Sequence, residues 1–441
     1  MSLMYSDEQV QTDATASAAA CIPRTMPFVH LKSTRTDRHV RAVAVLASFL
    51  AVLLLLSPFQ KSVADPLDKK GEAAAKKAQK TKGNGEPKSR LDDFKGRTKK
   101  GRAELALTQG GSPESELAVE AGLKWLVKHQ RPDGSWSFKH GPDEPGNLDN
   151  PTGATGLALL TFLGGGHTHK VGDYSKVVAD GLKFLMNQMQ MTAAGGDLRG
   201  PGGTMYSQGI CAIALCEAYA ISQDKSLRTP AEATVKFIIN AQDAKGGGWR
   251  YQPGQPGDTS VLGWQVMALT SARMASIAIP EKTLNRVTAF LNSVQTNDGA
   301  NYGYEAQGVG PATSAIGTLC RMSLGWTPKE ARLVKGVEFL GKTGPQPDNM
   351  YYNYYATQVM HHWGGEPWVK WNNALRDHIV KSQEKGGPAV GSWKPPMGGD
   401  HGDKAGGRHY RTCMSILTLE VYYRHLPLYQ REKIPRDPET K

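Results

Sequence analysis

The sequence predicts an all-α fold in which six pairs of helices close into a barrel of two concentric helix rings, an (α/α)6 toroid. The first observation behind this prediction is a repeat of a helical stretch, a Gly-rich turn, an aromatic residue and a second helical stretch. Bulky anchor residues of the first stretches recur every 39 to 59 residues, at Trp125, Phe184, Phe237, Phe290, Phe339 and His378. Repeated helix pairs of this kind bury one another by stacking.

The second observation is that the two helical stretches of each unit differ in polarity. The first stretch is amphipathic, as in 114–128, where Leu123 and Trp125 alternate with Glu120 and Lys124. The second stretches are dominated by Ala, Gly, Ser, Thr, Cys and Leu, over residues 155–163, 209–221, 261–278, 313–324, 354–362 and 412–423. A helix that is apolar nearly all round is buried, which places the second stretches in an inner ring.

The third observation concerns the first and last units. An open stack of repeats needs a polar outer face on its terminal units, and neither terminal unit of this chain has one. Closure into a ring is therefore favoured. In a ring, the long connections 131–153, 243–260 and 384–409 lie on one rim, and loops commonly carry function.

A Gln, a Gly and an aromatic residue recur where most first stretches end. The motif residues are Gln130, Gly134, Trp136, Gln242, Gly248, Trp249, Gln295, Gly299, Gln383, Gly391 and Trp393. Gly permits the left-handed turn that ends a helix, and a Gln side chain there can satisfy free carbonyl groups beneath the aromatic ring. We interpret the motif as structural, because it pins helix pairs together. In the second unit, Gln188 and Gln190 are displaced from the motif position.

The chain before the repeats begins with a leader, residues 1–64. Residues 42–56 are uncharged and apolar and follow several arginines. This run is shorter than the roughly 20 residues of a membrane-spanning helix, and it fits the core of a secretory signal that ends at Ala64. An uncleaved anchor is the alternative. Both interpretations predict export, periplasmic or secreted, and association with the membrane or cell envelope through this segment.

Residues 65–113 are rich in Lys, Ala, Gly and Glu and are predicted to form a disordered basic linker. The toroid is expected over 114–430, with a short tail at 431–441. Half of the net charge of +12 comes from 65–104, which holds 13 Lys or Arg against 7 Asp or Glu. A basic linker beside a nearly balanced globule is typical of a solvated tether, so no nucleic-acid partner is expected.

Four cysteines lie within the repeats, at Cys211, Cys216, Cys320 and Cys413. Cys211 and Cys216 are five residues apart on one expected helix, too far apart for a disulfide. Cys320 and Cys413 fall in units that are not neighbours. All four are expected to be small buried thiols.

The segments QRPDGSW, QDAKGGGW and QEKGGPAVGSW resemble the QW motif of squalene and terpenoid cyclases. The pattern is similar to the prenyltransferase/squalene-oxidase repeats of the terpenoid cyclase and protein prenyltransferase superfamily, over about residues 114–430. This resemblance implies the toroid fold. Class II cyclases of the family protonate an alkene with a DxDD motif, which this chain lacks. Prenyltransferases of the family bind Zn through a DxC pair and a His, and no DxC occurs here, so neither a metal nor another cofactor is expected.

Several polar and aromatic residues remain as candidates for a site. Asp258 is similar in placement to the family's acidic segment, with helix capping as the alternative. The candidates for catalysis are Asp258, His409, Tyr410 and Cys413, the second and last of which form an i,i+4 pair on one helical face. The candidates for ligand binding are Trp264, Tyr351, Tyr352, Tyr354, Arg408 and Arg411, because aromatic rings line isoprenoid or sugar pockets and arginines clamp anions.

These observations predict an exported toroid without terpenoid-cyclase chemistry. Its expected partner is a small apolar or carbohydrate-like ligand, or another component of the cell envelope. The alternative is a diverged enzyme, either an isoprenoid cyclase or a polysaccharide lyase or hydrolase. The oligomeric state is left open.

Overall fold

The computed structural model describes residues 90–429 except residues 142 and 427. The apolar run 42–56 and the tail 431–441 lie outside the described residues. In the part of the chain that is described, no helix has both the length and the apolar character needed to cross a membrane.

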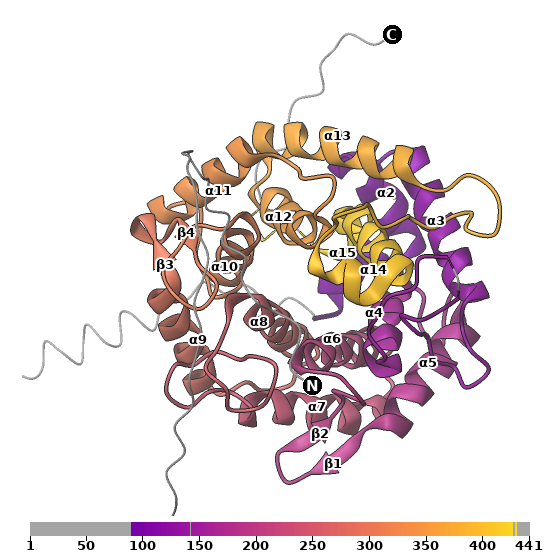
Figure 1. The fold of residues 1–441 in the computed structure, drawn as a ribbon, viewed down its shortest axis with the longest axis horizontal. Helices are drawn as coiled ribbons and strands as arrows, with labels where there is room; N and C mark the ends of the chain where they lie inside the picture. Colours follow the sequence, from indigo (N-terminus) through magenta and orange to yellow (C-terminus); the bar gives the residue numbers. More distant parts are fainter. Residues whose placement is uncertain (1–89, 142, 427, 430–441) are drawn as a thin grey trace, which may run out of the picture. The chain divides into compact units, whose positions relative to one another are not determined.

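Within the described residues, six helices form the inner ring of a closed barrel (Figure 1). They are α4 (Pro151–Gly164), α6 (Met205–Ser222), α8 (Thr259–Met274), α10 (Pro311–Ser323), α12 (Met350–Trp363) and α14 (His401–Leu419). Each packs against the next, and α14 returns to pack against α4. The predicted all-α toroid is therefore confirmed, with the second helical stretches inside.

The first helical stretches form the outer ring. They are α3 (Pro113–Lys128), α5 (Ser175–Gln188), α7 (Arg228–Asn240), α9 (Glu281–Val294), α11 (Ala331–Thr343) and α13 (Gly365–Ser382). The last outer helix, α13, packs against the first, α3. Short elements interrupt the connections: the hairpin of β1 (Gln190–Thr192) with β2 (Gly195–Asp197), η2 (Lys225–Leu227), and the hairpin of β3 (Gln295–Thr296) with β4 (Asn301–Tyr302), which encloses η3 (Asn297–Gly299).

Each connection from an outer helix to the next inner helix lies at one end of the barrel, which we call the motif end because it carries the Gln-Gly-aromatic motifs. We call the opposite end, where the inner helices finish, the carboxyl end. Small residues bring the inner helices close together. A Cβ on Gly156 of α4 would lie 2.8 Å from Cys211 Sγ of α6, and a Cβ on Gly263 of α8 would lie 2.6 Å from Ile316 of α10.

The three motif tryptophans make the same contact in three units. Each buried indole N–H donates to a carbonyl near the end of its own outer helix. The pairs are Trp136 with Leu126 (2.7 Å), Trp249 with Ile238 (2.8 Å) and Trp393 with Ile379 (2.7 Å). The ring thereby covers the helix end and supplies a hydrogen bond to a carbonyl there.

The motif glutamines join neighbouring outer helices. The side-chain amide of Gln383 donates to the Gly391 carbonyl in its own turn (2.9 Å) and to the Ala118 carbonyl in α3 (2.7 Å), so it ties the last unit to the first. Gln130 and Gln242 make the equivalent pair of bonds, each to a glycine carbonyl of the turn and a carbonyl of the next outer helix.

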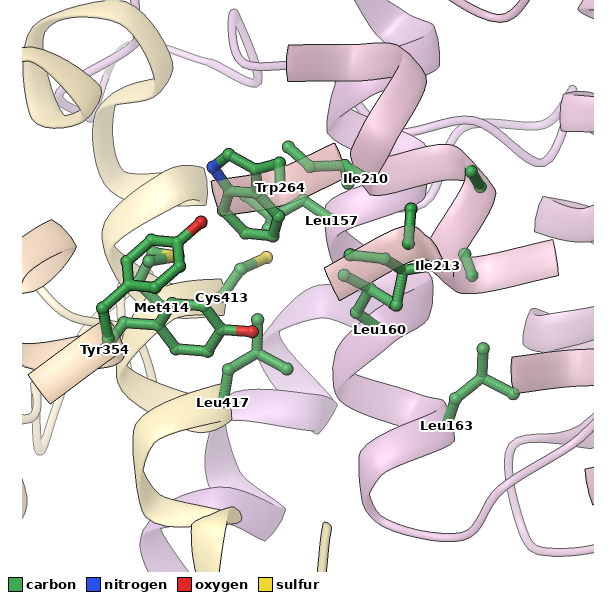
Figure 2. Packing of buried hydrophobic residues seen from close by; sticks show 14 of the residues in the cluster. Leu157, Leu160, Leu163, Ile210, Ile213, Trp264, Tyr354, Cys413, Met414 and Leu417 are labelled. Carbon is green, nitrogen blue, oxygen red and sulfur yellow. The ribbon is translucent and has the colours of Figure 1, made fainter. Parts of the chain in front are cut away.

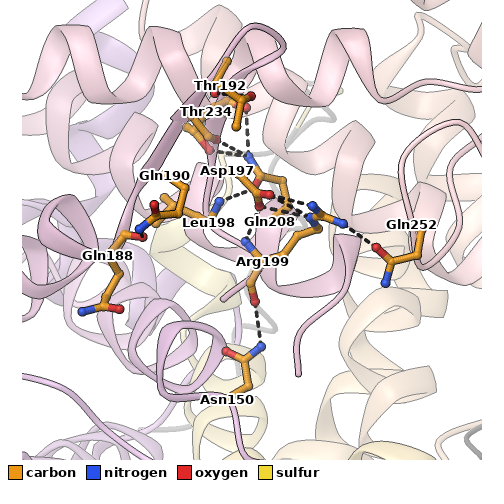
Figure 3. Close-up of polar contacts among 12 residues, drawn as sticks. Asn150, Gln188, Gln190, Thr192, Asp197, Leu198, Arg199, Gln208, Thr234 and Gln252 are labelled. Carbon is orange, nitrogen blue, oxygen red and sulfur yellow. Dashed lines mark hydrogen bonds and ion pairs between the residues drawn. The ribbon is translucent and has the colours of Figure 1, made fainter. Parts of the chain in front are cut away.

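The second unit achieves the same contact with a residue outside the motif. Gln208, on inner helix α6, donates to the carbonyls of Gly196 (3.0 Å) and Thr234 (3.2 Å), the latter in outer helix α7 (Figure 3). It therefore replaces the displaced Gln188 and Gln190. In the fourth unit Gln295 accepts a hydrogen bond from Arg321 (3.3 Å) instead.

The turn glycines approach the next outer helix too closely for a side chain. Gly134 and Gly391 have φ of +87° and +88°, and a Cβ on Gly391 would lie 2.3 Å from the Ala121 carbonyl oxygen. In the third unit the left-handed residue is Gly247 (φ +81°), so the assignment to Gly248 is wrong. Gly248 is instead packed so closely that a Cβ would lie 2.8 Å from the Phe290 ring.

Part of the expected linker is folded. Residues 90–109 form η1 (Arg90–Arg97) and α2 (Lys99–Gln109), which pack against α15 (Val421–Arg424) at the carboxyl end. Phe94 and Ala106 are buried there, and the hydroxyl of Thr98 caps α2. The prediction that the chain is disordered up to residue 113 is therefore wrong for residues 90–109. Only two apolar residues among many charged ones become buried here, and this pattern is too weak to predict folding from the sequence.

Candidate functional site

Aromatic side chains of two inner helices pack against each other in the first halves of these helices, toward the motif end (Figure 2). Trp264 of α8 stacks on Tyr354 of α12, with ring centroids 5.6 Å apart and an angle of 17° between the planes. Tyr355 meets both rings edge-on. All three side chains are buried. Two of the expected ligand-binding residues therefore contact each other inside the core.

Of the other two expected aromatic residues, Tyr351 packs edge-on against Tyr355, with ring centroids 5.2 Å apart, and Tyr352 lies away from the stack. Tyr352 packs edge-on against Trp371 of the outer ring, and its hydroxyl donates to the Gly344 carbonyl (3.1 Å). Tyr351 is half-buried at the motif end, where its hydroxyl bonds to Ser260 and its backbone N–H donates to Asp400 (2.9 Å). The four aromatic candidates do not line one common pocket.

His409 and Cys413 are close, but their environment opposes a thiolate–imidazole pair. Cys413 Sγ lies 3.7 Å from His409 Nε2, which also lies 3.0 Å from the Ala154 carbonyl oxygen. A carbonyl only accepts, so Nε2 carries the hydrogen and cannot take a proton from the thiol. Burial lowers the pKa of His409 to about 3 and raises the pKa of Cys413 well above its ordinary value. Both groups are therefore neutral.

The two candidate arginines are bound to partners within the protein. Arg408 forms ion pairs with Glu144 of the first unit and donates to Ser392 Oγ (3.0 Å). Arg411 donates to Asp403 (3.2 Å) and to the Pro347 carbonyl (2.6 Å). They point to different partners and tie the last inner helix to its surroundings. Their neighbour Tyr410 is also buried.

Asp258 is the one carboxyl group among the candidates predicted from the sequence, and its pKa is shifted. It caps α8 by accepting from the Val261 N–H (2.7 Å), and its other oxygen lies 3.9 Å from Arg250, which pairs with Glu305. Burial raises the pKa of Asp258 to about 6 despite these favourable contacts. It is a buried acid that changes its charge near neutral pH.

A cavity of about 800 Å³ lies at the carboxyl end. Its apolar wall comes from the second halves of inner helices and the chain that follows them, and includes Met267, Met274, Ile277, Leu319, Met322 and Leu428. Gln358 and His362 of α12 also line it. The hydroxyl of Tyr354 contacts the Met267 sulfur (4.0 Å), so the aromatic stack borders the cavity.

One wall of this cavity is charged. Arg97 of η1, Glu217 of α6 and Arg424 of α15 line it, and all three are buried. Arg97 donates to Glu217 at 2.6 Å, while Arg424 reaches the same carboxylate only at 3.4 Å. Although burial opposes ionisation, the two arginines hold the pKa of Glu217 below its ordinary value.

Three more titratable groups lie near this wall, and burial favours the uncharged form of each. Burial raises the pKa of Glu420 well above its ordinary value, and nearby arginines only partly offset this. Burial lowers the pKa of His362 to about 4 and that of His425 well below its ordinary value. At neutral pH the buried charge at this wall is therefore carried by Arg97, Glu217 and Arg424, while the exposed Arg273 and Glu281 also line the cavity.

The charged residues of the cavity wall do not belong to any motif of the sequence. Arg97 lies in the expected linker, and Arg424 and Glu217 each occur in an apolar helical stretch. A charged residue inside such a stretch is a usable signal, because it is rarely buried unless it is paired or functional. Among the described residues, no group of three or more His, Cys, Asp or Glu side chains could hold a metal ion.

No protein-family model matches this sequence, and no curated protein sequence matches it. Solved structures with the same fold include cellobiose 2-epimerase from Spirochaeta thermophila, at 14% identity and a TM-score of 0.52, covering 73% of this chain and 99% of that chain. Cellobiose 2-epimerase from Bacillus thermoamylovorans is similar at 12% identity and a TM-score of 0.52, covering 69% and 98%. A type II terpene cyclase from Scytonema matches at 11% identity and a TM-score of 0.48, covering 70% and 97%.

These comparisons define the class of protein: the chain has the α/α-toroid fold. At such low identities the likeness shows the fold alone. It does not choose between sugar and terpene chemistry, because one fold supports many functions.

Proposed function

We propose that this chain is an exported α/α toroid that binds an apolar or amphipathic small molecule at its carboxyl end, without terpenoid-cyclase chemistry. The cavity of about 800 Å³ carries the proposal, because small-molecule sites occupy roughly 300–1,000 Å³. Methionine, leucine and isoleucine side chains form much of its wall. Polar residues such as Thr270, Ser271 and Gln358 line the rest, so the wall suits an amphipathic ligand with a sizeable apolar part.

The first described helix lies at the end of the barrel that holds the cavity, because Arg97 of η1 lines it. An anchor at residues 42–56 would offer the protein a ligand from the membrane, whereas cleavage at Ala64 would leave it to a ligand from the periplasm or the medium.

The proposal is tested by identifying what the protein retains. The full chain is produced in an exporting bacterial host, purified without detergent, and its bound molecules are extracted and identified by untargeted mass spectrometry. We expect a lipid-like molecule near one equivalent per chain. A retained glycan, or nothing in the wild-type protein after lipid incubation, would overturn the proposal.

A matched pair of variants locates the ligand. Thr270→Trp places an indole in the cavity, which Thr270 lines, whereas Thr288→Trp introduces the same side chain on outer helix α9, away from it. Both threonines are half-buried and donate to the carbonyl four residues earlier, so the two changes remove similar contacts. Thr270→Trp should lose the retained molecule, and Thr288→Trp should keep it. Equal retention by both would place the ligand elsewhere.

A second candidate function is a diverged enzyme that uses Asp258 as an acid, because its pKa is raised to about 6 by burial. Against this, Asp258 precedes Thr270 by twelve positions on α8, which corresponds to about 18 Å along the helix. An acid at that distance does not reach a ligand in the cavity. Turnover of a polyprenyl substrate that is abolished by Asp258→Asn would favour the enzyme.

A further inference from the structure

The charged wall of the cavity contains an arginine with unused hydrogen-bonding capacity. Arg424 is almost fully buried, and its Nε and Nη1 have no hydrogen-bond partner among the described residues. Only its Nη2 bonds to a carboxylate, at 3.4 Å from Glu217. A buried guanidinium with unpaired donors is costly unless another group accepts from them.

The charges around Arg424 do not balance. Arg97 and Arg424 contribute two positive charges and Glu217 one negative charge. Glu420, on the preceding helical turn, has both carboxylate oxygens buried without a partner among the described residues, and burial favours its protonated form. Arg102 already pairs with Glu116 (2.7 Å). One positive charge of this buried cluster therefore remains beside the cavity, whose wall also holds apolar and uncharged polar side chains and the exposed residues Arg273 and Glu281.

Resting on the proposed function above, we propose that the bound molecule is an amphiphile with one acidic head group, a carboxylate or a phosphate, which pairs with Arg424. The unpaired N–H groups at Nε and Nη1 can donate to the oxygens of such a group, and hydrogen bonds between two charged groups are strong. The apolar part of the ligand lies along Met267, Leu319 and Met322. Arg97 stays bound to Glu217 and holds the wall in place.

The test compares ligands that differ only at the head group. Binding of palmitic acid, hexadecyl phosphate and hexadecanol to the full chain is measured by displacement of a fluorescent fatty alcohol at pH 7.5. We expect the wild-type protein to bind at least one of the two acids about tenfold or more tighter than the alcohol, since hydrogen bonds to charged groups are the strong ones. The acid that binds tighter identifies the head group.

Two variants assign this preference to Arg424. Arg424→Met retains the length and apolar stem of the side chain but removes the charge, so acid and alcohol should bind within about twofold of each other. Arg424→Lys keeps the positive charge but loses the several N–H donors of the guanidinium, so a weaker preference for the acid over the alcohol should remain. Thermal unfolding monitored by circular dichroism shows whether each variant folds; if Arg424→Met does not, Arg424→Lys alone decides.

The outcomes separate the two proposals. If no ligand binds, or if Thr270→Trp leaves binding unchanged, the proposed function fails. If acid and alcohol bind the wild-type protein equally well, the cavity binds apolar molecules but the head-group inference is wrong. An acid preference that persists in Arg424→Met also overturns the inference and assigns the head group to another residue.

Discussion

The two ends of the barrel use buried polar groups differently. At the motif end, Arg408 and Arg411 form ion pairs and Gln383 bonds to two carbonyls, so the polar side chains support the ring. At the carboxyl end, Arg424 keeps unused donors beside a cavity of about 800 Å³. The difference teaches that the repeated Gln motif helps to build the toroid, whereas the charged wall of the cavity consists of residues that the repeats do not share.

The largest effect is expected at the motif end, from Trp393→Ala. This change removes a buried ring and its bond to the Ile379 carbonyl in the unit that closes the barrel. Truncating a buried Trp costs about 3–5 kcal/mol, measured as the free energy of unfolding in urea. Met397→Ala, in the same connection but fully exposed, is the control and should change little. A small loss from Trp393→Ala would show that this clamp is not needed for closure.

The next effect distinguishes two glycines of one loop. Gly391 and Gly398 both have positive φ, at +88° and +79°. A Cβ on Gly391 would lie 2.3 Å from the Ala121 carbonyl oxygen, whereas a Cβ on Gly398 meets nothing within 4 Å. Gly398→Ala should therefore cost only the backbone term of about 1–2 kcal/mol, and Gly391→Ala clearly more. Equal losses in urea unfolding would mean that the close approach to α3 is unimportant.

The sequence predicts the ring better than the site. Gln130, Gln242 and Gln383 recur at a fixed distance from an anchor, so the pattern reveals them. Gln208 makes the same contact from an inner helix, so it does not follow the pattern. Its bonds to carbonyls of the turn and of the next outer helix depend on its position in space and not on its position in the chain.

The site could not be read from the same pattern for a related reason. The sequence predicts function at the long loops of the motif end. At this end Trp264 stacks on Tyr354 and Arg408 forms an ion pair with Glu144, so these side chains contact one another and not a ligand. The charged wall joins Arg97, Glu217 and Arg424, which are up to 327 residues apart in sequence. Only ring closure brings them together.

A pH-dependent effect is expected at the carboxyl end from Glu420→Gln. Burial raises the pKa of Glu420 well above its ordinary value in the folded protein. The folded state then holds a proton that the unfolded state releases above pH 4 or so, and stability falls as pH rises toward the folded-state pKa. The variant lacks this loss and should be more stable at pH 8 by about 1–3 kcal/mol.

Urea unfolding of wild-type and Glu420→Gln protein at pH 5 and pH 8 measures this difference, and exposed Glu366→Gln is its control. The advantage of Glu420→Gln should grow with pH. A variant that is less stable than the wild type at pH 8 would show that Glu420 is ionised and neutralises Arg424, which would remove the excess charge from the cavity wall.

A second pH-dependent effect is expected back at the motif end, from Asp258→Asn. Asparagine can still accept the Val261 N–H and cap α8, so little structure is lost. Burial raises the pKa of Asp258 to about 6, so its contribution to stability is present below pH 4 or so and is lost as pH rises through about 6. The variant should nearly match the wild type at pH 4 and exceed it by up to about 3 kcal/mol at pH 7, because each pKa unit corresponds to about 1.4 kcal/mol. Asp298→Asn, 82% exposed in its side chain, should show no such trend. If Asp258→Asn is less stable at pH 7, the ionised carboxylate pairs with Arg250, and the motif end then contains one more internally satisfied charge rather than a buried acid.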